Sequence, residues 1–272
     1  MSLPRPTPSS AALVTGASAG IGASIARELA RREHNVVLVA RRKQRLTDLA
    51  EELSHEYGIR AETVSCDLAK PAPRGRLPGQ VSDLGLEVDI LINNAGFATG
   101  GPFADSDPGR ELAQVRVLVE AVVALTSAFL PDMVARRRGA ILNVASTAAM
   151  QPLPHAAGYS AAKSYVLTFS EAIHQEVSGQ GVTVTALCPG PVETDFWQGA
   201  DWQVAGGRSF EKALPRPALV SVEDVARAGV SGLDGGRRVV IPGLGMRAAM
   251  LATRYVPHSV KLPMIEQVMR RR

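Results

Sequence analysis

Tyr159 and Lys163 stand four residues apart in a segment with helical periodicity, which places both on one face of a helix about one turn apart. A tyrosine phenol with a pKa of about 10 is a poor base at neutral pH, but a neighbouring ammonium favours the phenolate. A unit charge about 4 Å away, at an effective dielectric of about 20, contributes roughly 4 kcal/mol, or about three pKa units. The pair therefore suits acid–base catalysis, although the same spacing also occurs by chance on many helices.

Ser146 lies thirteen residues before Tyr159, at the carboxyl end of a predicted strand over 140–145. Open α/β sheets bind their ligands at this end of the strands. A hydroxyl there can orient a substrate carbonyl beside the Tyr159 phenol, or it can serve only as a strand-end cap. Ser146, Tyr159 and Lys163 are accordingly our candidate catalytic residues.

A glycine-rich turn near the N-terminus indicates a phosphate-binding loop. An apolar run at 11–14 precedes glycines at 16, 20 and 22, and apolar residues at helical spacing follow, which predicts a strand, a tight turn and a helix. Glycines permit a close approach of backbone to ligand, and the first turn of a helix attracts a pyrophosphate. The spacing differs from the common Gly-x-Gly-x-x-Gly, so an ordinary glycine-rich turn is the alternative. The candidate contacts are Gly16, Ser18, Ala19, Gly20, Ile21 and Gly22.

The end of the second predicted strand indicates which dinucleotide binds. Sites for NAD place an acidic residue about 20 residues beyond the glycine motif, where it binds the ribose 2′-hydroxyl. Arg41 and Arg42 stand there instead. Two arginines at a helix start are unfavourable for its dipole unless an anion is near, and a 2′-phosphate would supply one. We therefore predict NADP(H) over NAD(H), through Arg41 with Arg42 assisting; a solvated basic helix start is the alternative.

Strands and helices alternate along the chain, as in a single-domain α/β protein with a doubly wound, Rossmann-type parallel sheet of about seven strands and helices on both faces. The crossover at 71–79 is rich in proline and glycine, so we expect a short or broken helix there. The predicted strands cover 11–14, 35–40, 61–66, 88–93, 140–145, 182–188 and 238–241, and the main helices begin near 20 and cover 43–57, 110–137 and 158–177.

Three segments flank or interrupt this pattern. Residues 1–10 read as a flexible N-terminal tail, 11–243 as the dinucleotide-binding and catalytic domain, and 244–272 as a C-terminal helical extension. Within the domain, 189–217 is rich in Gly, Trp and Pro and fits a mobile loop over a substrate. The extension mixes apolar and basic residues, so it is either an ordinary docked helix, a cover for the substrate cleft or a peripheral membrane contact. We expect it to border the cleft.

Composition narrows the function classes. Of the 272 residues, 46% are hydrophobic and 21% charged, which is ordinary for a globular protein with a good core. A net charge of +4 with only 4% aromatic residues disfavours nucleic-acid binding. Cys66 and Cys188 each lie in an apolar run, consistent with reduced thiols and a cytoplasmic location. We expect no signal peptide, no transmembrane segment and no metal site.

In their order and spacing, the motifs resemble the classical short-chain dehydrogenases/reductases over about residues 10–243. Some stretches, Gln151-Pro152-Leu153-Pro154 among them, look most like bacterial ketoacyl reductases. The motifs are Thr15-Gly16-x-x-x-Gly20-Ile21-Gly22, Asn93-Asn94-Ala95-Gly96, Ser146, Tyr159-x-x-x-Lys163 and Pro189-Gly190.

The resemblance implies roles for these residues. Tyr159 would be the general acid in ketone reduction, Ser146 would hold the carbonyl, and Lys163 would bind the nicotinamide ribose while lowering the pKa of the tyrosine. Asp67 would meet the adenine and Thr194 the nicotinamide carboxamide. With Tyr159 and Lys163, the cofactor-binding candidates implied in this way are Asp67, Asn94, Ala95, Gly96, Pro189, Gly190, Val192 and Thr194.

Leu118 departs from the family pattern. The family usually has a helix asparagine 28 residues before the serine, where it completes a proton relay, and leucine occupies that position here. Leu118 is either a core residue in an otherwise normal enzyme or a sign that catalysis is impaired. The leading hypothesis is an NADP(H)-dependent oxidoreductase that interconverts a ketone and a secondary alcohol, with a 3-oxoacyl or other apolar carbonyl substrate. The alternative is a dinucleotide-binding sensor or partner protein with weak or lost catalysis.

The helices predicted at 110–137 and 158–177 carry more apolar residues than one sheet face requires. Family members pair these helices between subunits, so we predict a homodimer or homotetramer. The surplus residues are Val115, Val119, Val122, Val123, Val166, Leu167, Phe169 and Ile173.

Overall fold

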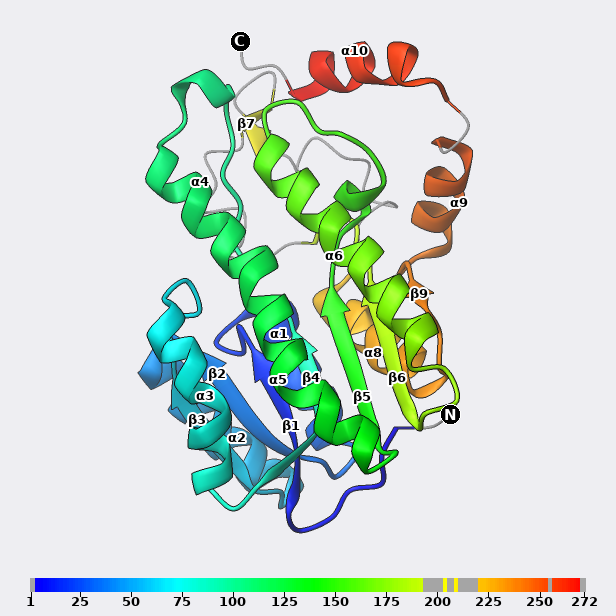
Figure 1. The fold of residues 1–272 in the computed structure, drawn as a ribbon. Helices are drawn as coiled ribbons and strands as arrows, with labels where there is room; N and C mark the ends of the chain where they lie inside the picture. Colours follow the sequence, from blue (N-terminus) through cyan, green and yellow to red (C-terminus); the bar gives the residue numbers. More distant parts are fainter. Residues whose placement is uncertain (1–2, 193–202, 205–207, 210–219, 254–255, 270–272) are drawn as a thin grey trace.

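Seven parallel strands form one sheet in the order β3-β2-β1-β4-β5-β6-β9 (Figure 1). The structure is a computed structural model and describes residues 3–192, 203–204, 208–209, 220–253 and 256–269. The predicted fold class is confirmed: the order reverses between β1 and β4, as in a doubly wound Rossmann-type sheet. The strands are β1 (Ser10–Thr15), β2 (Asn35–Ala40), β3 (Ala61–Ser65), β4 (Glu87–Asn93), β5 (Gly139–Val144), β6 (Val182–Leu187) and β9 (Val239–Val240), and a separate antiparallel pair joins β7 (Gln203–Val204) to β8 (Arg208–Ser209).

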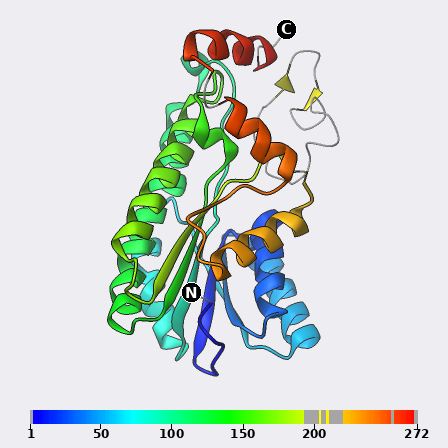
Figure 2. The same cartoon turned by 90° about the vertical axis from the view of Figure 1, so that its right-hand side faces the viewer.

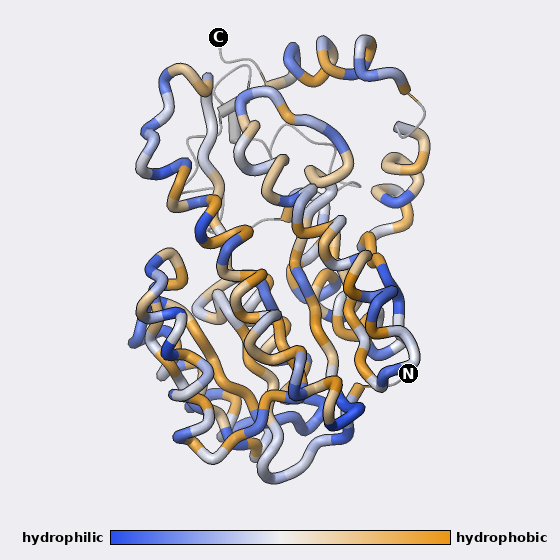
Figure 3. The backbone as a smooth tube through the Cα atoms, in the orientation of Figure 1, coloured by the Kyte–Doolittle hydropathy of each residue, from blue (hydrophilic) through white to orange (hydrophobic). Residues whose placement is uncertain are grey.

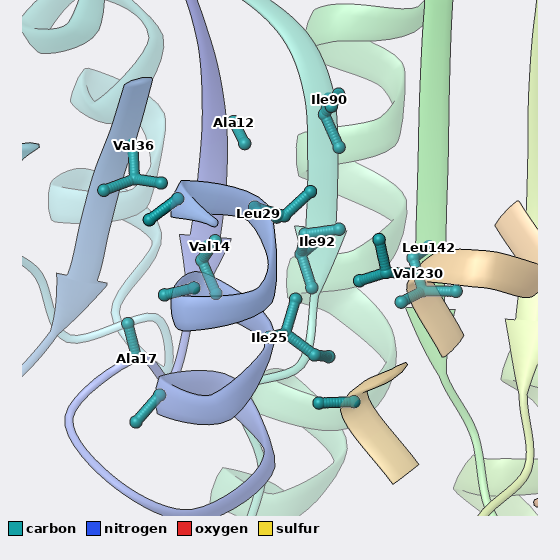
Figure 4. Close-up of a cluster of buried hydrophobic side chains, with 14 of the residues drawn as sticks. Ala12, Val14, Ala17, Ile25, Leu29, Val36, Ile90, Ile92, Leu142 and Val230 are labelled. Atoms are coloured by element: carbon teal, nitrogen blue, oxygen red, sulfur yellow. The ribbon is translucent and has the colours of Figure 1, made fainter. Parts of the chain in front are cut away.

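Helices cover both faces of the sheet (Figures 1 and 2). One face carries α1 (Gly20–Ala30), α2 (Lys43–Tyr57) and α8 (Val222–Asp234), and the other carries α3 (Pro71–Asp83), α5 (Ala121–Ala135) and α6 (Ala157–Glu176). Successive side chains along each strand point to opposite faces of the sheet and so pack against the two helix layers in turn. Val14 of β1 packs with Ile25 of α1 (Figure 4), whereas Leu13 belongs to the opposite layer. Figure 3 shows hydrophobic residues following the strands between these layers.

The crossover helix α3 corrects one expectation. It runs unbroken over thirteen residues, Pro71–Asp83, although a short or broken helix was expected. Pro71 and Pro73 fall in the first turn, where a backbone N–H has no helical partner to lose. Pro78 cannot donate to the carbonyl of Arg74, but Leu77 and Val81 are buried against the sheet. Tertiary packing therefore outweighs the local cost of the prolines.

The long helix predicted at 110–137 is present, but one wider turn interrupts it. It comprises α4 (Pro108–Val115), a π-helical turn η2 (Arg116–Glu120) and α5, and Leu118 lies in the middle of η2. In the described part of the chain, this helix, Pro108–Ala135, is the one long and apolar enough to cross a membrane by length and composition. Its Ala121, Leu125 and Met133 side chains lie in the core beside the sheet.

The first and last described segments of the chain pack on the domain. Residues 3–9, expected as a flexible tail, are held instead: the Leu3 N–H donates to Asp234 Oδ1 (2.8 Å), and Asn35 Nδ2 donates to the Thr7 carbonyl (3.1 Å). The C-terminal extension forms α9 (Leu244–Thr253) and α10 (His258–Met269). Both helices lie at the carboxyl edge of the sheet, beside and above α6 (Figures 1 and 2).

Candidate active site

The glycine loop between β1 and α1 leaves room for a phosphate. Gly16 and Gly20 adopt positive φ angles of 67° and 57°, which favour glycine. A Cβ on Gly22 would lie 2.4 Å from the Gly16 carbonyl oxygen, so the loop closes only with glycine there. The N-cap of α1 is Ala19, no side chain caps this end, and the first turn holds no acidic residue. The cradle therefore fits the pyrophosphate of a dinucleotide.

Thr15 and Asn94 join the ends of β1 and β4 beside this loop. Asn94 Nδ2 donates to the Thr15 carbonyl (2.9 Å), and the Asn94 and Ala95 N–H groups donate to Thr15 Oγ1 (2.9 and 3.1 Å). Thr15 Oγ1 in turn donates to the Ile92 carbonyl (3.0 Å). These bonds fix the switch point of the sheet, where dinucleotides bind in this fold.

The two arginines after β2 lie beside the glycine loop. Arg42 donates from Nε and Nη2 to Ser18 Oγ, at 3.1 and 2.9 Å. Arg41 and Arg42 are both exposed and both line the same cavity as Ser18. The guanidinium of Arg42 is thus already oriented toward the phosphate loop, which fits an additional anion there.

One cavity of about 720 Å³ unites most of the predicted site residues. Both the glycine loop and the three candidate catalytic residues line it. Gly22 does not line it but supports the loop from the first turn of α1. Thr194 and most of the predicted loop 189–217 lie outside the described residues. The predicted residues that line the cavity are Gly16, Ser18, Ala19, Gly20, Ile21, Arg41, Arg42, Asp67, Asn94, Ala95, Gly96, Ser146, Tyr159, Lys163, Pro189, Gly190 and Val192.

Two elements position the catalytic candidates. Ser146 follows β5, where its Oγ accepts from the Ala148 N–H (3.1 Å), and Tyr159 and Lys163 lie in the first two turns of α6. Lys163 Nζ donates to the Val144 carbonyl at the end of β5 (2.7 Å) and lies 5.8 Å from the centre of the Tyr159 ring. A hydrogen bond also joins Ser146 to the Tyr159 side chain.

Burial sets the protonation of this pair. Desolvation raises the pKa of Tyr159 to about 12, against the opposing effect of its hydrogen bond with Ser146. Desolvation also lowers the pKa of Lys163 to about 8. The expected lowering of the tyrosine pKa by Lys163 is not found: the hydrogen bond with Ser146 supplies the lowering effect, and burial outweighs it. With this pKa, Tyr159 is a neutral phenol at pH 7 and can act as a proton donor.

Leu118 belongs to the same buried apolar cluster as Tyr159. It is 1% exposed and shares an apolar cluster with Ala98, Tyr159, Ala162 and Met269. Its position in a π-helical turn was not visible in the sequence, because the apolar spacing of the helix continues through it.

The expectation that the C-terminal extension borders the cleft is confirmed, because Met246 and Met250 of α9 line the cavity. Sequence reasoning missed Phe97 and Val117, and it did not assign Leu153 to the site, although all three line the same cavity. Phe97 and Val117 belong to no motif, so only the fold identifies them.

The comparisons with known proteins place this chain among the short-chain dehydrogenases. The family described as short chain dehydrogenase matches residues 10–204, so the chain belongs to it and is an oxidoreductase. A Streptomyces violaceoruber protein named as a granaticin polyketide synthase ketoacyl reductase is 37% identical over 76% of this chain and 79% of its own length. The very-long-chain 3-oxoacyl-CoA reductase of Bos taurus is 34% identical over 67% of this chain, but the match spans only 59% of that relative. The structure of a short-chain dehydrogenase from Sphingobium yanoikuyae in complex with NADPH superposes with a TM-score of 0.78 at 31% identity, covering 95% of this chain and 96% of that one.

Proposed function

We propose that this protein is an NADP(H)-dependent reductase that converts an apolar ketone, such as a 3-oxoacyl compound, into a secondary alcohol, and catalyses the reverse reaction. The observation that carries this proposal is that one cavity holds both a dinucleotide cradle and the hydrogen-bonded Ser146 and Tyr159. The names of the Streptomyces and Bos taurus relatives support the 3-oxoacyl class.

Tyr159, Ser146 and Lys163 have different roles at the substrate carbonyl. When bound, the nicotinamide supplies the hydride. The Tyr159 hydroxyl donates a proton to the carbonyl oxygen, and Ser146, fixed by the Ala148 N–H, hydrogen-bonds to the same oxygen. Lys163, whose Nζ is held by the Val144 carbonyl and lies 5.8 Å from the centre of the Tyr159 ring, would hold the ribose of the cofactor. Burial of the tyrosine keeps its proton available throughout the neutral range.

The proposed preference for NADPH rests on Arg41 and Arg42. They replace the acidic residue of NAD sites, and Arg42 is already hydrogen-bonded to Ser18 of the phosphate loop. A 2′-phosphate would accept charge-assisted hydrogen bonds from these guanidinium groups. The NADPH complex of the Sphingobium yanoikuyae protein supports the same preference.

A panel of carbonyl compounds tests the proposed function. We expect NADPH consumption, followed at 340 nm, with 3-oxoacyl thioesters and apolar ketones, and its loss in Tyr159→Phe. No consumption with any 3-oxoacyl thioester, steroid, quinone or simple ketone would favour the sensor hypothesis that Leu118 raised.

Assembly and location are further proposals. We infer a homodimer or homotetramer that pairs α4, α5 and α6 between subunits, supported by exposed apolar side chains such as Leu112 (57% exposed), Val115 (42%) and Tyr165 (45%). Val122, Val166 and Ile173 are buried within the subunit and therefore cannot form part of the predicted interface.

The proposed location is the cytoplasm, supported by the buried free thiols Cys66 and Cys188.

A further inference from the structure

The C-terminal extension contributes side chains to the cavity that the catalytic residues line. Met246 and Met250 are one turn apart on α9, and both line the cavity that contains Ser146 and Tyr159. A Cβ on Gly190 would lie 2.8 Å from Met246 Cε, so the missing side chain at 190 lets Met246 lie against the backbone that follows β6. This extension lies beyond residues 10–204, the part of the chain that matches the family.

Helix α10 fixes the extension onto the active-site elements. Met269 is 7% exposed and joins the cluster of Leu118 and Tyr159, and Ile265 packs against the same cluster. Glu266 lies 3.2 Å from His155 Nε2 in the loop before α6. Lys261 Nζ donates to the Thr253 carbonyl at the end of α9 (3.3 Å). The two helices, hereafter the α9–α10 arm, are thus attached to the domain at both ends.

Outside the cofactor cradle and the catalytic group, the described lining of the cavity is mainly apolar. Phe97, Val117, Leu153, Met246 and Met250 contribute to it, and Thr147 and Gln151 are its polar side chains. Among the described residues that line the cavity, the charged ones are Arg41, Arg42, Asp67 and Lys163, which belong to the cofactor cradle and the catalytic group. Among the described lining residues, a polyhydroxylated or charged substituent would lose hydration and find few partners besides Thr147 and Gln151. An apolar chain gains by burial, and methionine side chains adapt to chains of different shape.

We propose that the α9–α10 arm is the specificity element of this enzyme, and that Met246 and Met250 bind a long, flexible, apolar substituent of the carbonyl substrate. The proposal rests on the proposed reductase function. It accounts for the presence of both methionines in the cavity that Ser146 and Tyr159 line, and for the packing of α10 in the cluster that contains Tyr159.

The test compares 2-butanone with 2-octanone on the full-length protein. Each buried methylene contributes about 0.8 kcal/mol, or about fourfold, so kcat/KM should rise at least tenfold from the short to the long ketone. Met250→Gln and Met246→Gln should each lower this ratio fivefold or more. Leu251→Gln is the matched control, because Leu251 neighbours Met250 on α9 but is 55% exposed, and it should keep the wild-type ratio. A wild-type ratio near one, or methionine variants that keep the ratio, would overturn the proposal.

A binding measurement separates this proposal from the proposed function. Calorimetric titration of both ketones into protein saturated with NADP⁺ involves no turnover, because the oxidised cofactor cannot reduce a ketone. If the wild type binds 2-octanone at least tenfold more tightly and Met250→Gln loses that difference, the arm proposal holds even if no ketone is reduced. Equal binding of the two ketones contradicts the arm proposal, whereas absent turnover with selective binding contradicts the reductase proposal alone.

Discussion

Lys163 Nζ donates a 2.7 Å hydrogen bond to the carbonyl oxygen of Val144, which links the catalytic helix α6 to the end of β5. The lysine is buried (5% exposed), so its position is fixed by the fold before any ligand binds. Its burial makes the charged form costly, which has a measurable consequence for stability.

The stability of the wild type should rise with pH above about 8, relative to Lys163→Met. The pKa of Lys163 is about 8 in the folded protein and near its ordinary value of about 10.4 in the unfolded chain. Between these values the unfolded chain holds a proton that the folded protein has released, so rising pH favours folding. From pH 7 to 9.5 we expect a relative gain of about 2 kcal/mol in the free energy of unfolding, measured by urea denaturation. If the free energy of unfolding depends on pH in the same way for the wild type and Lys163→Met, this prediction is contradicted.

Arg41→Ala and Arg42→Ala should each weaken NADPH binding while leaving NADH binding nearly unchanged. Hydrogen bonds to charged groups contribute about 1.5–3 kcal/mol, so the dissociation constant for NADPH should rise about tenfold or more. Fluorescence titration of the reduced cofactors measures both constants. Lys43→Ala is the control, because Lys43 directly follows Arg42 and is also exposed but does not line the cavity. Equal affinity of the wild type for NADPH and NADH would refute the preference.

Leu118→Asn should raise turnover. Leucine offers neither donor nor acceptor to a buried water, which needs two to four polar partners, so proton resupply to Tyr159 should be slow in the wild type. Loss of a relay behind the acid should cost no more than the lower part of the ~10²–10⁴-fold range of general acid–base catalysis.

Steady-state kcat is the measurement, with Leu118→Ala as the control that removes the leucine without adding an amide. Both variants should be less stable, because Leu118 is 1% exposed in an apolar cluster. If folded Leu118→Asn turns over no faster than the wild type, the chain either has another proton route or needs none.

Light scattering at about 10 µM protein should give a mass of two or four times 28.7 kDa. Leu112→Asp places a charge among the exposed apolar side chains of α4 and should shift the mass toward the monomer. Leu244→Asp changes an equally apolar side chain that is 86% exposed on α9 and should leave the mass unchanged. A monomeric wild type would overturn the assembly proposal.

The fold and the cofactor cradle could be predicted because their signals are local. Buried strands such as Val36–Val39 are short apolar runs, and Gly16 and Gly20 mark a turn that needs positive φ angles. A helix was predicted at the crossover, but the unbroken length of α3 was not, because it depends on the burial of Leu77 and Val81 against the sheet. Residues 3–9 likewise depend on distant partners such as Asp234.

The catalytic site was predictable only in part. The spacing of Tyr159 and Lys163 fixed their common helix face, but the direction of the tyrosine pKa shift depends on how deeply the pair is buried. Met246 and Met250 are ordinary apolar residues in an amphipathic segment. Their role depends on where α9 meets Gly190, a contact between elements far apart in the sequence.

Isotope transfer tests the central claim most directly. The wild type, given a 3-oxoacyl thioester and NADPH deuterated at the transferable C4 position, should yield an alcohol with one deuterium on the carbinol carbon, as detected by mass spectrometry. Tyr159→Phe should still bind NADPH but form labelled alcohol at least a hundredfold more slowly. An unlabelled alcohol, or equal rates of labelled product from both proteins, would contradict carbonyl reduction by this site.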